Sequence, residues 1–279
     1  MPAPQANLPY FNALLRLLDD NPALAQTFGR HVHWGYWETP QAACPDAAGF
    51  AAAAERLTRQ VSDAAQIEDG QRVLDVGCGF GGTVASLNER FTDISLHGLN
   101  IDPRQLARAQ QQTPPQDTNR IHWINADACV LPFADQSFDA VLAVECIFHF
   151  PSRRAFFQEA YRVLKPGGRL ALSDFLGTPW MRPVMWLKSR LPHSYGFYGD
   201  CDVHFMFSHY RALAQEIGFQ PSVERDITAH TLPTYAFLRE LRKHVAFNSL
   251  PAAIETLLIE STSRLGLLRY GVLGWQKPS

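Results

Sequence analysis

Apolar and polar positions between residues 70 and 175 alternate in a way that predicts strands and helices in turn. Five short runs rich in β-branched and other apolar residues predict strands buried on both faces. These runs are 72–76, 94–99, 121–125, 140–144 and 170–173. Stretches with helical periodicity separate them, for example 103–112 with proline in its first turn and 153–164 before Lys165-Pro166-Gly167-Gly168. This order predicts a parallel sheet covered by helices on both faces.

The flanking segments differ from this core. Residues 8–30 and the alanine-rich run 47–65 predict helices, whereas residues 175–208 are dense in aromatics, Met and Pro with weak periodicity. A helix over 210–217 and a terminal strand over 270–275 restore the regular pattern. We therefore expect an N-terminal helical cover (1–69), an α/β core (70–174), a substrate lid inserted into it (175–209) and a C-terminal completion of the core (210–279).

The composition indicates a chain that can bury a full hydrophobic core and has a net charge close to zero. Of its 279 residues 46% are hydrophobic, and 25 basic against 27 acidic residues leave a net charge of −2. Without a basic surface to hold phosphates, a nucleic-acid partner is not expected. Five cysteines without a CxxC pair argue against a disulfide framework or a zinc site and fit a reducing cytoplasm. We recognise no signal peptide and no bilayer-spanning stretch, so we expect a cytoplasmic protein without stable membrane insertion.

A glycine-rich segment follows the first predicted strand and opens a helix. Gly77-Cys78-Gly79-Phe80-Gly81-Gly82 matches GxGxxG, the pattern that lets a backbone approach a nucleotide cofactor. A dehydrogenase would show the same pattern, and a tight turn alone also uses glycine. Asp75, two residues upstream, distinguishes these readings because its carboxylate would repel a pyrophosphate. It suits a cofactor with a cationic amino-acid end, which argues against NAD.

The segment Val73–Gly81 resembles the first signature motif of class I S-adenosylmethionine (SAM)-dependent methyltransferases. Three later segments resemble the family's further motifs in the same order: Leu131-Pro132-Phe133, Ser137-Phe138-Asp139-Ala140-Val141 and Arg162-Val163-Leu164-Lys165-Pro166-Gly167-Gly168. The resemblance covers residues 70–175. It implies an α/β, Rossmann-like, seven-stranded and mostly parallel sheet with an antiparallel last strand. It also implies SAM as cofactor and S-adenosylhomocysteine (SAH) as product.

The same resemblance implies which residues touch the cofactor. Asn100 ends the second strand, where the family usually has an acidic residue on the ribose; members with small hydrophobic substrates also have a neutral residue there. Asp127 resembles the family's adenine reader, although an N-cap or Asx-turn is an alternative. The full expected set is Tyr36, Trp37, Asp75, Gly77, Cys78, Gly79, Asn100, Ile101, Gln105, Asp127, Ala128 and Val144.

Tyr36 and Trp37 belong to a separate motif, His31-Val32-His33-Trp34-Gly35-Tyr36-Trp37. Two histidines at i and i+2 without a nearby carboxylate are poor metal ligands. The motif resembles an H-x-G-x-W segment that small-molecule methyltransferases fold over the methionine end of SAM. Tyr36 and Trp37 would then pack near the sulfonium, where aromatic faces favour a cation. Ordinary aromatic packing under an N-terminal helix is the alternative.

The methyl acceptor is expected beyond the carboxyl end of the fourth strand. Methyl transfer from a sulfonium mainly needs alignment, and a base only where the acceptor loses a proton. His149 has a suitable pKa range and aligns with a histidine frequent in sugar, tocopherol and sterol-type methyltransferases. Glu145 aligns with a glutamate that, in members methylating isoprenoid double bonds, is thought to stabilise a carbocation or take its proton. For each of these two residues a purely structural role is the alternative to a catalytic one. We rank His149 above Glu145 as the base.

The expected lid carries a dense set of adaptable apolar side chains. They are Trp180, Met181, Met185, Trp186, Tyr195, Phe197, Tyr198, Phe205, Met206 and Phe207. Such a surface suits a small hydrophobic acceptor, although a satellite core or a dimer face is an alternative. We expect a SAM-dependent methyltransferase acting at O, N or C of a small hydrophobic metabolite, of isoprenoid or other secondary metabolism, with no metal ligands identified. The competing readings are an NAD-type oxidoreductase and a non-catalytic SAM-binding module; a homodimer is left open.

Overall fold

The computed structural model describes residue 15, residues 30–181, residue 202, residues 204–244 and residues 250–279. The helix expected over 8–30 therefore lies almost wholly outside the described residues. The same holds for the lid side chains between 182 and 201. Within the described ranges, no helix is long and apolar enough to cross a membrane.

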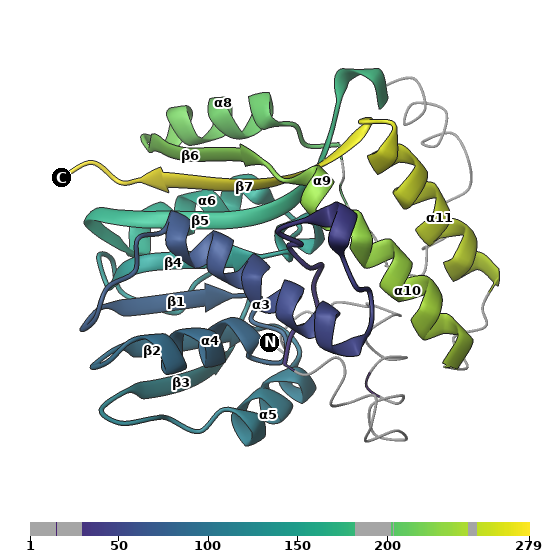
Figure 1. Cartoon of the computed structure of the whole chain (residues 1–279). Helices are drawn as coiled ribbons and strands as arrows, with labels where there is room; N and C mark the ends of the chain where they lie inside the picture. The colour runs from purple at the N-terminus through teal and green to yellow at the C-terminus, as the bar shows by residue number, and fades with distance from the viewer. Residues whose placement is uncertain (1–14, 16–29, 182–201, 203, 245–249) are drawn as a thin grey trace.

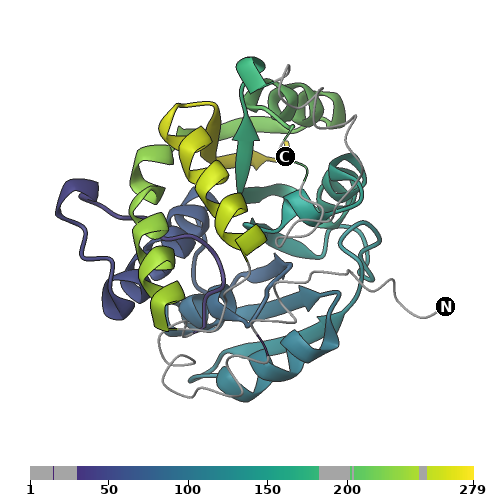
Figure 2. The same ribbon diagram turned by 90° about the vertical axis from the view of Figure 1, so that its right-hand side faces the viewer.

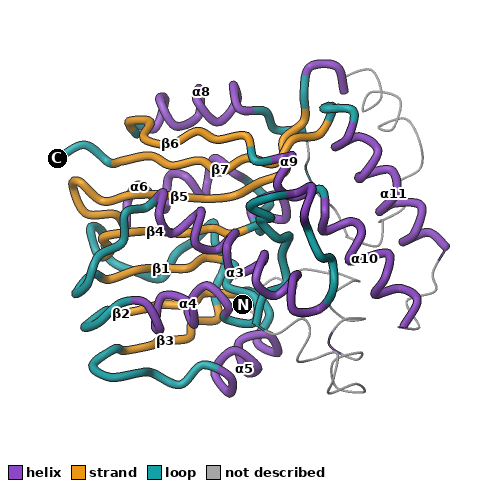
Figure 3. Tube along the Cα trace, in the orientation of Figure 1, coloured by secondary structure: helices purple, strands orange, loops and turns teal. Residues whose placement is uncertain are grey.

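Seven strands form a single sheet in the order β3-β2-β1-β4-β5-β7-β6. They are β1 (Arg72–Val76), β2 (Ser95–Asn100), β3 (Arg120–Asn125), β4 (Phe138–Val144), β5 (Leu164–Gly177), β6 (Gln220–Asp226) and β7 (Leu268–Gln276). Only β7 runs antiparallel to its neighbours β5 and β6, and β1 to β5 pair in parallel. Figure 3 shows the strands as one layer between helices. The expected seven-stranded sheet with an antiparallel last strand is confirmed.

β5 is longer than the sequence pattern predicts. It continues through Gly177, three residues into the range expected for the lid, because β7 pairs with it from Arg169 to Gly177, as in Phe175↔Tyr270 and Gly177↔Leu268. The extension brings Asp174 and Phe175 into the sheet at its carboxyl end. Both side chains are buried there.

Helices cover the two faces of the sheet (Figure 1). On one face lie α3 (Ala47–Ala64), α4 (Gly82–Arg90) and α5 (Pro103–Gln112), whose apolar residues share a core cluster with Val73 of β1. On the other face lie α6 (Arg153–Val163) and α8 (Phe207–Ile217), which share a cluster with Leu74 and Val76. Successive residues of β1 thus serve opposite cores, as the pleat of a strand requires.

The carboxyl ends of the parallel strands carry the remaining elements, and Figure 2 looks onto this end. The loops among the described residues include the short 3-10 turns η1 (Pro40–Ala42), η2 (Ile147–His149) and η3 (Pro179–Met181). The short helix α9 (Thr228–Thr231) leads into α10 (Pro233–His244), which lies beside α11 (Leu250–Arg264). The last two helices are joined by a 3.1 Å contact between the hydroxyls of Tyr235 and Ser263. Binding residues in open α/β sheets gather at this end.

Candidate active site

The glycine-rich turn between β1 and α4 is held closely against its neighbours. The N–H groups of Gly77 and Cys78 both donate to the carbonyl of Leu99 in β2, at 2.8 and 3.0 Å. Gly77 has φ of +73°, and a Cβ there would lie 2.7 Å from both Cβ and Sγ of Cys146. Only glycine satisfies both the backbone angle and this contact. The glycine-rich turn is therefore in direct contact with the loop after β4.

Asp75 supplies the electrostatic feature of the turn. Its side chain is 2% exposed, and its Oδ2 is buried without a hydrogen-bond partner among the described residues. Burial raises the pKa of Asp75 to about 8. A buried carboxyl that lacks a partner is costly unless a ligand provides one. The α-ammonium of SAM fits this requirement.

At the end of β2, Asn100 and Gln105 form a hydrogen-bonded pair. The Asn100 amide nitrogen donates to Gln105 Oε1 at 3.2 Å, and its oxygen accepts from the backbone N–H of Asp102 at 3.0 Å. Both side chains are buried, while Ile101 between them is half-buried. The two amides thus lie together beside the glycine turn. Their contact with the ribose stays a prediction.

Asp127 follows β3 and forms a local turn. Its Oδ1 accepts from the backbone N–H of Cys129 at 2.8 Å, which is an Asx-turn. Ala128 is buried in the core. A backbone bond of 3.2 Å from Ala126 to the carbonyl of Asn100 holds this loop beside the end of β2. The adenine contact of Asp127 stays a prediction, with one of its oxygens engaged in the turn.

Residues 30–37, which we name the cover segment, contact the glycine turn through Arg30, His31 and Val32. A Cβ at Gly79 would be 3.1 Å from Val32 Cγ2, and a Cβ at Gly82 would be 2.4 Å from His31 Nδ1. Tyr36 packs against the cluster that contains Cys78 and stacks on His230 at 4.5 Å. The cover segment therefore packs over the glycine turn, where the methionine end of the cofactor is expected.

Trp37 lies apart from that surface. It is 4% exposed, packs with Phe50, Ala53 and Phe237, and donates its indole N–H to Thr234 Oγ1 at 3.0 Å. These contacts match the aromatic-packing alternative. The structure does not bring Trp37 together with the glycine turn, and no cofactor contact is assigned to it.

The carboxyl end of β4 carries Val144, Glu145 and the loop to His149. Val144 is buried in the same cluster as Cys78. Glu145 has φ of +50°, and its Oε2 accepts from the Trp34 N–H at 2.9 Å and from the Tyr270 hydroxyl. Burial raises the pKa of Glu145 to about 8, although these two donors oppose the shift. The carboxyl thus joins β4, β7 and the cover segment.

His149 ends η2 and is half-buried, with Phe148 packed against its ring at 4.4 Å. The loop that carries it passes directly along the glycine turn. Besides Cys146, which meets Gly77 from one side, Phe150 Cε1 would lie 3.8 Å from a Cβ at Gly77. The residues before and after η2 therefore both face the glycine turn, where the cofactor is expected.

Sequence reasoning missed two further residues at this end. Tyr270 of β7 reaches Glu145, and Arg153 of α6 donates to Asp174 at 3.1 Å, to the hydroxyl of Tyr210 at 3.0 Å and to the Asp202 carbonyl at 2.6 Å. Arg153 thereby ties α6 to β5, α8 and the end of the expected lid. The partners are distant in sequence, so no local motif could have indicated them. Among the described residues, no group of three or more His, Cys, Asp or Glu could hold a metal ion.

Comparison with known proteins identifies the family. A family model described as a methyltransferase domain matches residues 74–172. The 27-O-demethylrifamycin SV methyltransferase of Amycolatopsis mediterranei is 32% identical over 227 residues, which cover 81% of this chain and 77% of that protein. Methyltransferase GfsG of Streptomyces halstedii is 38% identical over 172 residues, and this match spans 60% of either chain.

A solved structure shows the same fold. The [4+2]-cyclase SpnF superposes with a TM-score of 0.73 at 22% identity, covering 100% of this chain and 98% of that one. A likeness at this identity shows the fold alone, and a fold does not dictate a reaction. The sequence matches decide the family, and they set aside the oxidoreductase reading. The chain belongs to the class I SAM-dependent methyltransferases that act on small molecules.

Proposed function

We propose that this methyltransferase acts on a hydroxyl oxygen of a small, largely apolar natural product, with His149 as the general base. When bound, SAM supplies an electrophilic methyl group. The chain's own residues then hold the cofactor, align the acceptor, exclude water and remove the hydroxyl proton. The relative from Amycolatopsis mediterranei, named for 27-O-demethylrifamycin SV, supports oxygen over nitrogen or carbon as the acceptor atom.

The observation that carries the proposal is the contact of the His149 loop with the glycine turn. Because Cys146 and Phe150 both face Gly77, an acceptor beside His149 would lie next to the cofactor. A series of apolar rings leads away from His149: Phe148 packs against it, Phe148 and Phe175 have centroids 5.9 Å apart, and Trp34 meets Phe175 edge-on at 5.4 Å. Such rings favour an apolar acceptor and a water-poor reaction site.

Glu145 is the weaker candidate for the base. With a pKa raised to about 8, its carboxyl is mostly protonated near neutrality, and its Oε2 already accepts two hydrogen bonds. A protonated carboxyl cannot remove a proton. We therefore assign Glu145 to the support of the site and His149 to proton transfer.

The test combines acceptor profiling with two isosteric variants. Purified protein is incubated with SAM and a panel of apolar hydroxyl, amine and prenyl compounds, and products are identified by mass spectrometry. We expect O-methylated products from the hydroxyl compounds. In His149→Gln, kcat should fall by about 100-fold or more while the Kd for SAH stays unchanged. In Glu145→Gln, a large part of kcat should remain.

Two results would overturn the proposal. One is methylation confined to nitrogen or carbon. The other is a loss of kcat in Glu145→Gln together with near-normal turnover in His149→Gln, which would transfer the base role to Glu145. Calorimetry with SAH on each variant shows whether an effect arises from lost cofactor binding.

A further inference from the structure

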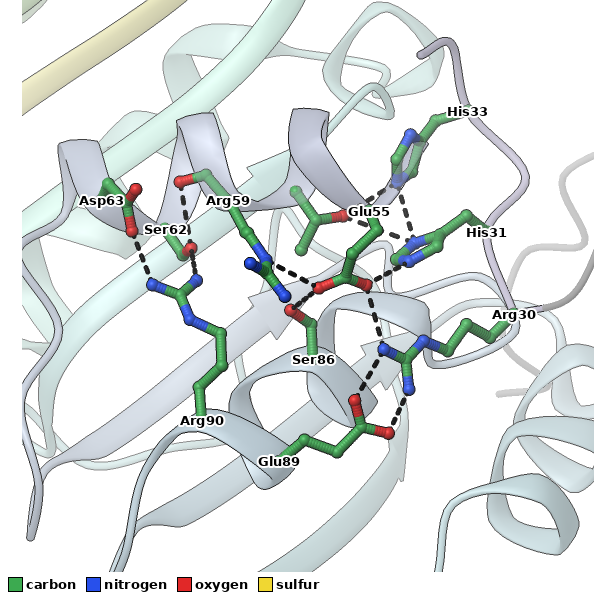
Figure 4. Close-up of polar contacts among 11 residues, drawn as sticks. Arg30, His31, His33, Glu55, Arg59, Ser62, Asp63, Ser86, Glu89 and Arg90 are labelled. Carbon is green, nitrogen blue, oxygen red and sulfur yellow. Dashed lines mark hydrogen bonds and ion pairs between the residues drawn. The ribbon is translucent and has the colours of Figure 1, made fainter. Parts of the chain in front are cut away.

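Glu55 of α3 is the meeting point of three separate parts of the chain (Figure 4). Its carboxylate accepts from Arg30 Nη2 at 2.9 Å and from Ser86 Oγ of α4 at 2.6 Å, and its Oε2 lies 2.9 Å from His31 Nε2. Arg59, one turn along α3, adds a contact of 3.2 Å. Burial opposes ionisation, but the donors from His31, Ser86 and Arg30 hold the pKa of Glu55 well below its usual range. The group is therefore a fixed negative charge under the cover segment.

From Glu55 a line of close polar contacts crosses the cover segment. His31 Nδ1 lies 3.1 Å from His33 Nε2, and His33 Nδ1 lies 2.8 Å from the carbonyl of Trp34. The N–H of Trp34 then donates to Glu145 at 2.9 Å. The cover segment is thus fastened at both sides, to α3 through Glu55 and to the end of β4 through Glu145.

Arg30 strengthens the first of these attachments. Besides Glu55 it contacts both carboxylate oxygens of Glu89 in α4. In the sequence it is followed by His31 and Val32. Its carbonyl would lie 2.5 Å from a Cβ at Gly82, and Val32 reaches Gly79. The side chain and the backbone of Arg30 therefore act at the same place, one holding the segment down and the other contacting the glycine turn.

We propose that Glu55 and Arg30 are positioning residues for the cofactor, because they hold the cover segment against the glycine turn that receives SAM. Neither residue needs to touch the cofactor. They contribute to affinity by keeping the cover segment in place before the cofactor binds, which lowers the conformational entropy lost on binding. This inference rests on the cofactor site and is independent of the acceptor proposed above.

The same two helices offer a matched control. Arg90 of α4 donates to Ser62 Oγ at 2.8 Å and to Asp63 at 2.7 Å, so it also ties α3 to α4 (Figure 4). The side chains of Arg30 and Arg90 are similarly covered, with exposures of 29% and 26%. Only the Arg30 tie includes the cover segment. Loss of either arginine should cost stability, whereas only Arg30 should affect the cofactor.

The experiment measures SAH binding by calorimetry and thermal unfolding for Arg30→Met, Glu55→Gln and Arg90→Met. We expect the first two variants to raise the Kd for SAH by about 3- to 30-fold, and Arg90→Met to leave it unchanged despite a lower Tm. Arg30→Lys, which keeps the charge, should recover part of the affinity. A purely structural role would not separate Kd from Tm in this way.

The proposal fails if Arg30→Met and Glu55→Gln bind SAH as the wild type does, or if Arg90→Met weakens binding equally. Should Glu55→Gln not fold, the comparison of Arg30→Met with Arg90→Met decides alone. Absence of SAH binding in the wild type would instead refute the cofactor assignment, so the two failures are distinguishable.

Discussion

Arg153 and Asp174 form a buried ion pair of 3.1 Å, with side chains 4% and 0% exposed. Burial raises the pKa of Asp174 to about 6 although Arg153 and the Tyr210 hydroxyl oppose the shift. Removing one partner of a buried ion pair destabilises the fold strongly, because the other charge is then left in the protein interior without compensation. The pair joins β5 to α6 at the end of the sheet that carries the site.

Arg153→Met should therefore destabilise the protein strongly, by about 3–5 kcal/mol, because Asp174 would be left as an unpaired buried carboxylate. Without the arginine, the pKa of Asp174 rises further. The free-energy cost of burying its carboxylate is then avoided only when the group is protonated. The loss should thus be larger at about pH 8 than at about pH 5, as measured by urea unfolding. Arg154→Met removes an exposed pair with Glu216 and serves as the control, with little change expected. Equal losses in the two variants would contradict the role of Arg153.

Glu145 should be more important as an acceptor than as a charge. In Glu145→Ala the Trp34 N–H loses Glu145 Oε2 as its acceptor, which should cost about 1–3 kcal/mol of unfolding free energy. The Tyr270 hydroxyl loses the same acceptor and keeps its 3.3 Å contact with Ser173 Oγ. Glu145→Gln keeps an acceptor oxygen and should lose less. Tyr270→Phe removes one donor and leaves Glu145 bonded to Trp34, so its loss should be the smallest. Urea unfolding of the three variants tests this order, and a Gln variant as unstable as the Ala variant would disprove it.

Cofactor binding should release a proton from Asp75. In the cofactor-free chain burial raises its pKa to about 8, so the carboxyl is mostly protonated near neutrality. The ammonium of SAH favours the carboxylate and drives the proton off. Affinity should thus increase as the pH rises from about 6 to about 8. The binding heat should also depend on the ionisation enthalpy of the buffer. A heat independent of the buffer would contradict this mechanism.

The same carboxyl should make the cofactor-free chain less stable at higher pH. Because the pKa of Asp75 is higher in the folded chain than in the unfolded one, stability falls as the pH rises through the interval between the two values. Asp75→Asn should remove this contribution and lose SAH affinity. Thermal unfolding of both proteins across the pH range, without ligand, measures the effect. A parallel pH profile in the two proteins would exclude it.

Gly82→Ala should weaken SAH binding without straining the backbone. Alanine is ordinarily favoured in helices by about 1 kcal/mol, but the added Cβ would lie 2.4 Å from His31 Nδ1 and 2.5 Å from the Arg30 carbonyl. The cover segment must therefore move. Gly70→Ala is the control, since Gly70 has φ of +77° and open space around its Cβ, so it should lower stability and leave the Kd unchanged. Identical Kd values in the two variants would refute this expectation.

The central sheet was predictable because its strands are buried on both faces. β1 matches the predicted run 72–76 residue for residue, and α5 matches 103–112. β6 was not recognised, because it is an edge strand whose residues, apart from the half-buried Val223, are exposed and include Pro221. Such a segment carries neither the alternation nor the apolar run that identifies a strand.

The site was predictable only as far as local motifs reach. Asp75, Gly77 and Asn100 lie at or directly after the carboxyl ends of strands whose positions along the chain the sequence pattern predicts. The contact of Glu145 with Tyr270 spans 125 positions and that of Arg30 with Glu89 spans 59. Contacts between residues so far apart in the sequence are set by tertiary packing, and the local periodicity of apolar residues does not predict them. The placement of Trp37 beside Thr234 follows the same rule, since an aromatic residue in a motif does not reveal which surface it meets.

The contact between Gly77 and Cys146 limits how this enzyme can be re-engineered. The thiol occupies the volume that a side chain at position 77 would need. The turn proposed for the methyl donor and the loop proposed for the acceptor are therefore tightly packed against each other. A larger residue at position 146, introduced to widen the range of acceptors, would push on the donor turn at the same time. Libraries aimed at new acceptors should therefore leave Cys146 intact and vary residues that do not face Gly77.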